Sequence, residues 1–171
     1  MILLGNAKTT YNLSKITERL YCGGLIYDEN EYQFLVKEGI THIINAALTE
    51  SNDAEILKLH PQMKYLFVGE PDDGQPKPKE WFDKTIRFTL EAYQTPGTIV
   101  YVHCAAGVNR GPSLAYAILR AIGLSRSEAF DTIKLNRPQA MIGYKVDADR
   151  ALIELGWTDD GVIGYEKNVQ K

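Results

Sequence analysis

A short apolar strand that leads through a loop into a helix is the feature that most constrains this chain. Residues 98–102, Thr-Ile-Val-Tyr-Val, are β-branched or aromatic, a composition typical of a buried strand. After Gly111, apolar residues recur at helical spacing, at Leu114, Ala117, Ile118, Ala121 and Ile122. Pro112 suits the first turn of a helix, where its missing N–H needs no partner. The sequence therefore predicts a buried strand, a loop and a helix over residues 112–122.

The loop between this strand and this helix carries Cys104 and, six positions later, Arg110. A loop that enters a helix N-terminus gathers unpaired N–H groups, which favour a bound dianion and an ionised cysteine. The planar guanidinium of Arg110 suits two phosphate oxygens, and Gly107 permits a tight curl. We therefore expect the Cys104 sulfur to attack a phosphate monoester and form a phosphocysteine that water hydrolyses. An inert core thiol is the alternative, which the ordered strand, loop, arginine and helix disfavour.

The stretch from Val102 to Arg110, Val-His-Cys-Ala-Ala-Gly-Val-Asn-Arg, resembles the His-Cys-x5-Arg signature of the Cys-dependent protein tyrosine phosphatase superfamily, most closely its dual-specificity branch. The resemblance covers residues 17–156, with weaker landmarks at residues 20–24, 39–45 and Arg137-Pro138. It implies that His103 orients the loop and tunes the thiolate. It also implies that the loop binds phosphate through Ala105, Ala106, Gly107, Val108, Asn109 and Arg110.

One position departs from this family pattern, because Gly111 stands where a serine or threonine usually follows the arginine. In the family, that hydroxyl helps the thiolate leave the phosphocysteine. We therefore expect the missing hydroxyl to affect the second step of the reaction and to leave the first unaffected. Ser113, two positions further on, need not reach the sulfur.

A proton donor for the leaving oxygen is expected on the loop 69–78, which is rich in proline, glycine and aspartate. Two adjacent carboxylates beside a bound dianion repel it, so at least one should take up a proton. In several small Cys phosphatases the acid directly precedes a glycine, and by that resemblance we choose Asp73, with Asp72 second. The alternative is that both are turn residues.

Alternating strand and helix signals predict an α/β fold, a central mostly parallel sheet flanked by helices on both faces. The expected strands are 19–25, 40–47, 65–68 and 98–102, and the expected helices are 28–39, 54–59, 80–93, 112–122, 125–136 and 145–155. Val36 and Val146 are expected to face the core. We expect residues 1–16 to form a lead-in, irregular over 5–15, residues 17–156 the catalytic domain and residues 157–171 a tail.

The composition fits one domain and excludes several classes of protein. A length of 171 residues allows a substantial core, and a net charge of −3 argues against a nucleic-acid binder. The apolar run 1–4 is too short for a membrane span, so no membrane association is expected. Two cysteines suit the cytoplasm or another reducing compartment. We expect a monomer that acts on phosphorylated protein with no cofactor, and no metal, because His42 and His60 lack partners at ligand spacing.

Three further residues each allow two interpretations. Asn45, at the end of the predicted strand 40–47, either braces the phosphate loop or makes a turn. Arg137 either adds charge to the pocket or is a cation at a helix end. Cys22 is either a resolving thiol that forms a disulfide with Cys104 under oxidation, or an inert buried cysteine.

Three other activities remain as alternatives. A phosphoglucan phosphatase fits the missing hydroxyl at Gly111, whereas a phosphoinositide phosphatase is disfavoured because the loop residues 105–109 are uncharged. A sulfurtransferase also uses a cysteine in a curled loop but has no need of a general acid. A pseudophosphatase that binds without turnover is favoured by Gly111 and disfavoured by the intact Cys104 and Arg110.

Overall fold

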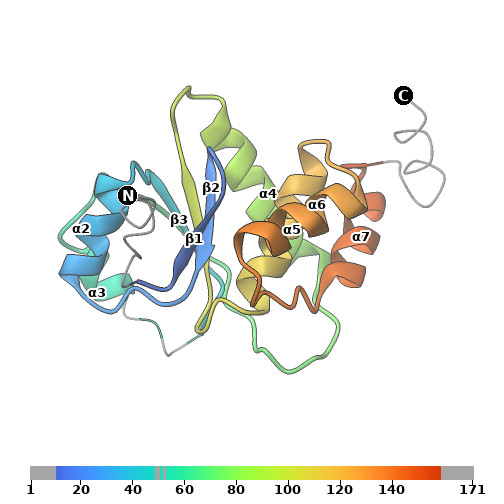
Figure 1. Ribbon diagram of the computed structural model, residues 1–171, viewed down its shortest axis with the longest axis horizontal. Helices are drawn as coiled ribbons and strands as arrows, with labels where there is room; N and C mark the ends of the chain where they lie inside the picture. Colours follow the sequence, from blue (N-terminus) through green and yellow to red (C-terminus); the bar gives the residue numbers. More distant parts are fainter. Residues whose placement is uncertain (1–10, 49–50, 52, 159–171) are drawn as a thin grey trace, which may run out of the picture.

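The computed structural model describes residues 11–48, 51 and 53–158, and shows one sheet between two layers of helices (Figure 1). The strands are β1 (Leu13–Thr17), β2 (Leu20–Gly23), β3 (His42–Asn45), β4 (Lys64–Phe67) and β5 (Val100–His103). Their order across the sheet is β1-β2-β5-β3-β4, with β1 antiparallel to β2 and the other pairs parallel. The expected α/β class with a mostly parallel sheet is confirmed.

Six helices of the described chain cover the two faces of the sheet. Helices α2 (Glu29–Lys37) and α3 (Asp53–Leu57) lie on one face, and α4 (Lys79–Tyr93), α5 (Arg110–Ala121), α6 (Arg126–Asn136) and α7 (Lys145–Glu154) on the other (Figure 1). Each layer encloses its own buried cluster, one around Tyr32 and Ile43 and one around Val102 and Leu114. Apolar burial from both sides therefore fixes the sheet, which is the expected arrangement.

The irregular conformation expected for residues 5–15 is wrong for Leu13 to Lys15, which belong to β1. Their backbone pairs with β2, with Leu13 opposite Gly23 and Lys15 opposite Tyr21. This edge strand is mostly half-buried, so it lacks the apolar run that marks a central strand. Residues 5–10 and 159–171 lie outside the described residues.

Two side chains do not face the core as expected. Val36 is 42% exposed and Val146 is 62% exposed. Both lie on helices that bury other residues, Leu35 on α2 and Leu152 on α7, so the apolar face is narrower than the sequence suggests. In the part of the chain that the structure describes, no helix has the length and apolar character needed to cross a membrane.

The four parallel strands end at one edge of the sheet, and this edge positions the candidate site. Gly23, Asn45 and His103 stand in register at the ends of β2, β3 and β5. Cys104 follows the end of β5, and α5 begins six residues later at Arg110. Loops that leave the carboxyl ends of parallel strands are the usual place for a ligand in such sheets.

Candidate active site

The loop from β5 to α5 forms a cup whose carbonyl groups are all bonded on the outside. The donors and their distances are His103 Nδ1 to Cys104 O at 3.1 Å, Leu25 N to Ala105 O at 3.1 Å, Asn12 Nδ2 to Ala106 O at 2.8 Å, Arg137 Nε to Gly107 O at 2.7 Å, Met141 N to Val108 O at 2.8 Å and Ser113 N to Asn109 O at 3.0 Å. By contrast, no described group accepts a hydrogen bond from the N–H groups of residues 105–109. A concave set of unpaired N–H groups is a binding site for an anion.

Arg137 holds this cup from behind. Its buried guanidinium donates through Nε to Gly107 O, through Nη2 to Asn12 Oδ1 at 2.6 Å and through Nη1 to Ser14 Oγ at 3.0 Å. Gly107 has φ +73°, and a β-carbon there would lie 2.3 Å from Arg137 Nη2, so the position requires glycine. Arg137 does follow the end of α6, as one interpretation expected, but its bracing role had no signal in the sequence.

Asn12 also braces the loop, although it lies in the segment expected to be irregular. Its side-chain amide donates to Ala106 O, and its backbone oxygen accepts from Gly24 N at 2.8 Å. The amide of Asn12 is 94 residues from its acceptor in the sequence. An isolated polar residue at such a separation gives no pattern that sequence analysis could detect.

Cys104 is almost fully buried, and Cys22 lies close to it. A β-carbon built on Gly111 would lie 3.5 Å from the sulfur of each cysteine, so both sulfurs flank the position of the missing hydroxyl. Burial raises the pKa of the Cys22 thiol well above its usual range, which disfavours its thiolate. The Ser113 hydroxyl does not replace the missing hydroxyl at position 111. Its Oγ instead accepts a hydrogen bond from Tyr144 N at 3.0 Å.

His103 is fully buried between the loop and α3. Its Nε2 lies 2.6 Å from Asp53 Oδ2, and its Nδ1 lies 3.1 Å from Cys104 O. A carboxylate on one ring nitrogen fixes the orientation of the ring, so the pair can hold His103 against the first peptide of the cup. Asp53 is itself 1% exposed and was missed, because nothing in the sequence links it to a histidine 50 residues away.

Asn45 makes a turn at the end of β3, one of its two expected roles. Its Oδ1 accepts from Ala47 N at 2.8 Å, two residues on. Its Nδ2 donates to Ser51 Oγ at 2.9 Å and to Tyr65 Oη at 3.0 Å. Among the described residues, its side chain has no hydrogen bond to the loop 104–110.

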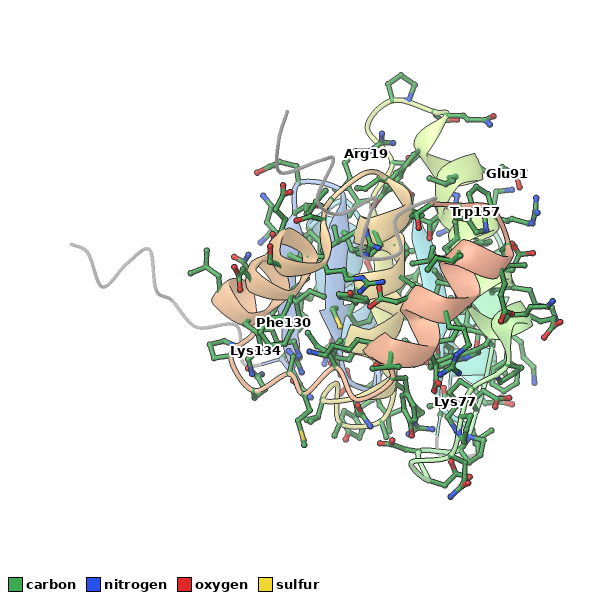
Figure 2. The ribbon with its side chains drawn as sticks, turned by 90° about the vertical axis from the view of Figure 1, so that its right-hand side faces the viewer. Arg19, Lys77, Glu91, Phe130, Lys134 and Trp157 are labelled. Carbon is green, nitrogen blue, oxygen red and sulfur yellow. The ribbon has the colours of Figure 1, made fainter. Side chains whose placement is uncertain are left out.

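The loop 69–78 lies against the cup, and its two candidate acids, Asp72 and Asp73, have different hydrogen-bond partners. Arg110 Nη1 donates to Glu70 O at 2.8 Å, and Asn109 Nδ2 donates to Asp72 Oδ1 at 2.8 Å. Asp73 instead accepts from Lys77 Nζ at 2.9 Å, and this bond lowers the pKa of Asp73. Figure 2 shows Lys77 near the end of α7 that is remote from Trp157. A general acid must hold a proton, and the ammonium group of Lys77 opposes this at Asp73, whereas Asp72 accepts from two neutral donors and contacts the cup, so Asp72, our second choice, is the better candidate.

Comparisons with known proteins place the chain in a family. The model for "Dual specificity phosphatase, catalytic domain" matches residues 25–154. The chain is 27% identical over 146 residues to dual specificity protein phosphatase 8 of Homo sapiens, which covers 82% of this chain and 22% of that protein. The chain therefore spans about a fifth of the length of the first curated relatives that it matches.

Solved structures share the fold. Human DUSP28 superposes with a TM-score of 0.69 at 21% identity, covering 86% of this chain and 97% of that one. PTPMT1 in complex with PI(5)P gives a TM-score of 0.69 at 20% identity, covering 81% of this chain and 94% of that one. The matched family model extends from the loop after β2 to the end of α7 and includes the entire cup. The chain belongs to the dual specificity phosphatase family.

Proposed function

We propose that this protein hydrolyses phosphate monoesters on proteins, at phosphotyrosine and at phosphoserine or phosphothreonine. The observation that carries the proposal is the cup itself. Its carbonyl groups are bonded on the outside, and the N–H groups of residues 105–109, beside Cys104, have no acceptor among the described residues. These donors and Arg110 would hold the three equatorial oxygens of the transferring phosphoryl group. No cofactor is needed, since the protein supplies the positive field.

The reaction has two steps in this proposal. The Cys104 sulfur attacks phosphorus while the bond from phosphorus to the leaving oxygen breaks, and Asp72 gives that oxygen a proton. Water then attacks the phosphocysteine, its proton passes to the Asp72 carboxylate, and phosphate and the Cys104 thiolate are released. His103 keeps the cup in place through its contact with Cys104 O.

Several finer assignments accompany this proposal. The uncharged side chains of residues 105–109 favour a substrate with one phosphate over a phosphoinositide. A catalytic thiolate favours the cytoplasm or another reducing compartment, and we propose a monomer. Because Asn12 and β1 brace the cup, we propose that the catalytic domain begins before residue 17 and ends at residue 156, with residues 157–171 as its tail.

A substrate panel tests the proposed activity. Wild-type protein and Cys104→Ser are assayed with phosphopeptides, a phosphoinositide and a phosphoglucan, and phosphate release is measured. We expect the highest kcat/KM with phosphopeptides and no activity in Cys104→Ser. Preference for the lipid or the glucan would change the substrate class. With p-nitrophenyl phosphate in a rapid-mix assay, the absence of both burst and turnover would indicate a pseudophosphatase, and persulfide formation from thiosulfate a sulfurtransferase.

A matched pair of variants tests the choice of acid. Asp72→Asn should lower kcat/KM for phenyl phosphate about 10²- to 10⁴-fold, the usual contribution of a general acid. Asp73→Asn should leave kcat/KM within about threefold of wild type, because Asp73 is paired with Lys77 and its lowered pKa keeps it ionised. The reverse result would restore Asp73 as the acid.

A further inference from the structure

The Asp72 carboxyl is held by two side chains from different parts of the chain. Asn109 Nδ2, in the cup, donates to Asp72 Oδ1 at 2.8 Å. The Tyr144 hydroxyl, from the residue that precedes α7, donates to the same oxygen at 2.8 Å. No other described group hydrogen-bonds to the carboxyl, so both bonds fall on Oδ1 and none on Oδ2.

This asymmetry determines which oxygen can carry a proton. A neutral carboxyl has one O–H donor and one carbonyl-like oxygen that only accepts. Because an amide N–H and a phenol O–H both donate to Oδ1, that oxygen is the acceptor in the neutral acid, and Oδ2 is the oxygen that can carry its proton. Burial raises the pKa of Tyr144, which keeps its hydroxyl a donor at neutral pH.

We propose that Asn109 and Tyr144 are positioning residues, which fix the Asp72 carboxyl so that Oδ2 carries the proton for the leaving oxygen. The inference rests on the proposed function and extends it to two residues that make no contact with the reacting atoms in this role. Asn109 therefore has a task for its side chain in addition to the backbone N–H that we assign to phosphate binding.

Both positioning side chains are themselves held in place. Asn109 Oδ1 accepts from Gly143 N at 2.5 Å, and Tyr144 N donates to Ser113 Oγ at 3.0 Å. The Tyr144 ring packs edge-on against the buried Trp81, with centroids 6.0 Å apart. Side chains that are already held by hydrogen bonds and packing lose little conformational entropy when they orient a catalytic group.

The same hydroxyl also anchors the loop that carries the acid. Gly74 N donates to Tyr144 Oη at 3.1 Å, and Lys77 N donates to Asp147 Oδ2 on α7 at 3.1 Å. With Arg110 bonded to Glu70 O, the loop 69–78 is attached near its start, its middle and its end. The start of α7 therefore positions both the loop and the carboxyl.

Leaving-group dependence tests the inference. We measure kcat/KM for the phosphate ester of a fluorinated, acidic phenol and for phenyl phosphate, whose phenol has a pKa of about 10. This constant reports only the steps up to formation of the phosphocysteine. An acidic leaving group needs no proton, whereas phenoxide does. Tyr144→Phe should lower kcat/KM about tenfold for phenyl phosphate and less than about twofold for the fluorinated ester. Asn109→Ala should show the same selectivity.

A double-variant comparison separates positioning from general damage. Adding Tyr144→Phe to Asp72→Ala should have no further effect on phenyl phosphate, because Tyr144 acts through Asp72. Tyr116→Phe is the matched control, since the Tyr116 hydroxyl also donates to an aspartate, Asp149 at 2.8 Å, and has no contact with Asp72. We expect it to match wild type on both substrates, with thermal midpoints measured for every variant.

The outcomes distinguish the two proposals. If wild type does not turn over either ester, the proposed function fails, and the positioning roles with it. Wild type and Asp72→Ala can behave as expected while Tyr144→Phe lowers kcat/KM equally for both esters, or for neither. In that case only the positioning roles are refuted. A further loss in the double variant would also refute them.

Discussion

Replacing Gly111 with serine should accelerate hydrolysis of the phosphocysteine, the step that we expect the missing hydroxyl to slow. A β-carbon at position 111 would lie 3.5 Å from Cys104 Sγ and 3.4 Å from Cys104 N, which are ordinary van der Waals distances. Serine therefore fits without displacing the cup. Its hydroxyl, one bond beyond the β-carbon, can reach hydrogen-bonding distance of the sulfur and stabilise the thiolate as it leaves phosphorus.

The size of the effect follows from the charge on the departing sulfur. A hydrogen bond to a charged group contributes about 1.5–3 kcal/mol, and each 1.36 kcal/mol changes a rate about tenfold. Hydrolysis of the phosphocysteine should therefore accelerate about 10- to 100-fold in Gly111→Ser. The rate of the first step should change little. In that step the sulfur is the nucleophile and loses negative charge as it bonds to phosphorus, so a hydrogen-bond donor at position 111 does not stabilise the product of the attack.

A rapid-mix assay with p-nitrophenyl phosphate separates the two steps. Wild type should release about one p-nitrophenol per site in a burst, followed by a slow steady state. Gly111→Ser should raise the steady-state rate and leave the burst rate unchanged, and Gly111→Ala, with the β-carbon but no hydroxyl, should behave as wild type. The reasoning would be refuted if Gly111→Ala raised the steady-state rate as much as Gly111→Ser does. It would also be refuted if Gly111→Ser gave a burst but no higher steady-state rate than wild type.

Three other perturbations have defined outcomes. Arg137→Ala removes buried bonds to the cup and should lower the free energy of unfolding by about 2–4 kcal/mol in urea, with loss of kcat/KM; an unchanged kcat/KM would show that the brace is dispensable. Gly107→Ala conflicts with φ +73° and with Arg137, and phosphate binding measured by calorimetry should disappear; retained binding would contradict this. Burial raises the pKa of Tyr65 to about 12, whereas an unfolded tyrosine ionises near pH 10. The stability that this shift provides is complete below about pH 10 and is lost as the pH rises through 12, so Tyr65→Phe should lose less stability over that range.

The fold and the centre of the site were predictable because their signals are local. The run 98–102 lies largely within β5, and the helical spacing after Gly111 lies within α5. Ser125 and Glu128 form the expected capping box at the start of α6. Each of these patterns depends on residues a few positions apart, where periodicity and caps determine the structure.

The braces of the cup were not predictable because they join distant residues. Arg137 reaches Gly107 across 30 positions, and Asp53 reaches His103 across 50. The choice between Asp72 and Asp73 also depends on tertiary structure, since Tyr144 bonds one from 72 positions away while Lys77 pairs with the other. Adjacent aspartates on one loop carry no sequence signal for which of them faces the cup.

The outward bonds of the cup couple its shape to the whole chain. Asn12, Leu25, Arg137 and Met141 come from three separate segments, the last two from the connection between α6 and α7, and each holds one carbonyl of the same short loop. Release of any one segment by partial opening would let a peptide rotate and present its oxygen to the anion. Inactivation on warming should consequently precede the cooperative loss of helical circular dichroism, because fraying at one end of the molecule is enough to abolish anion capture.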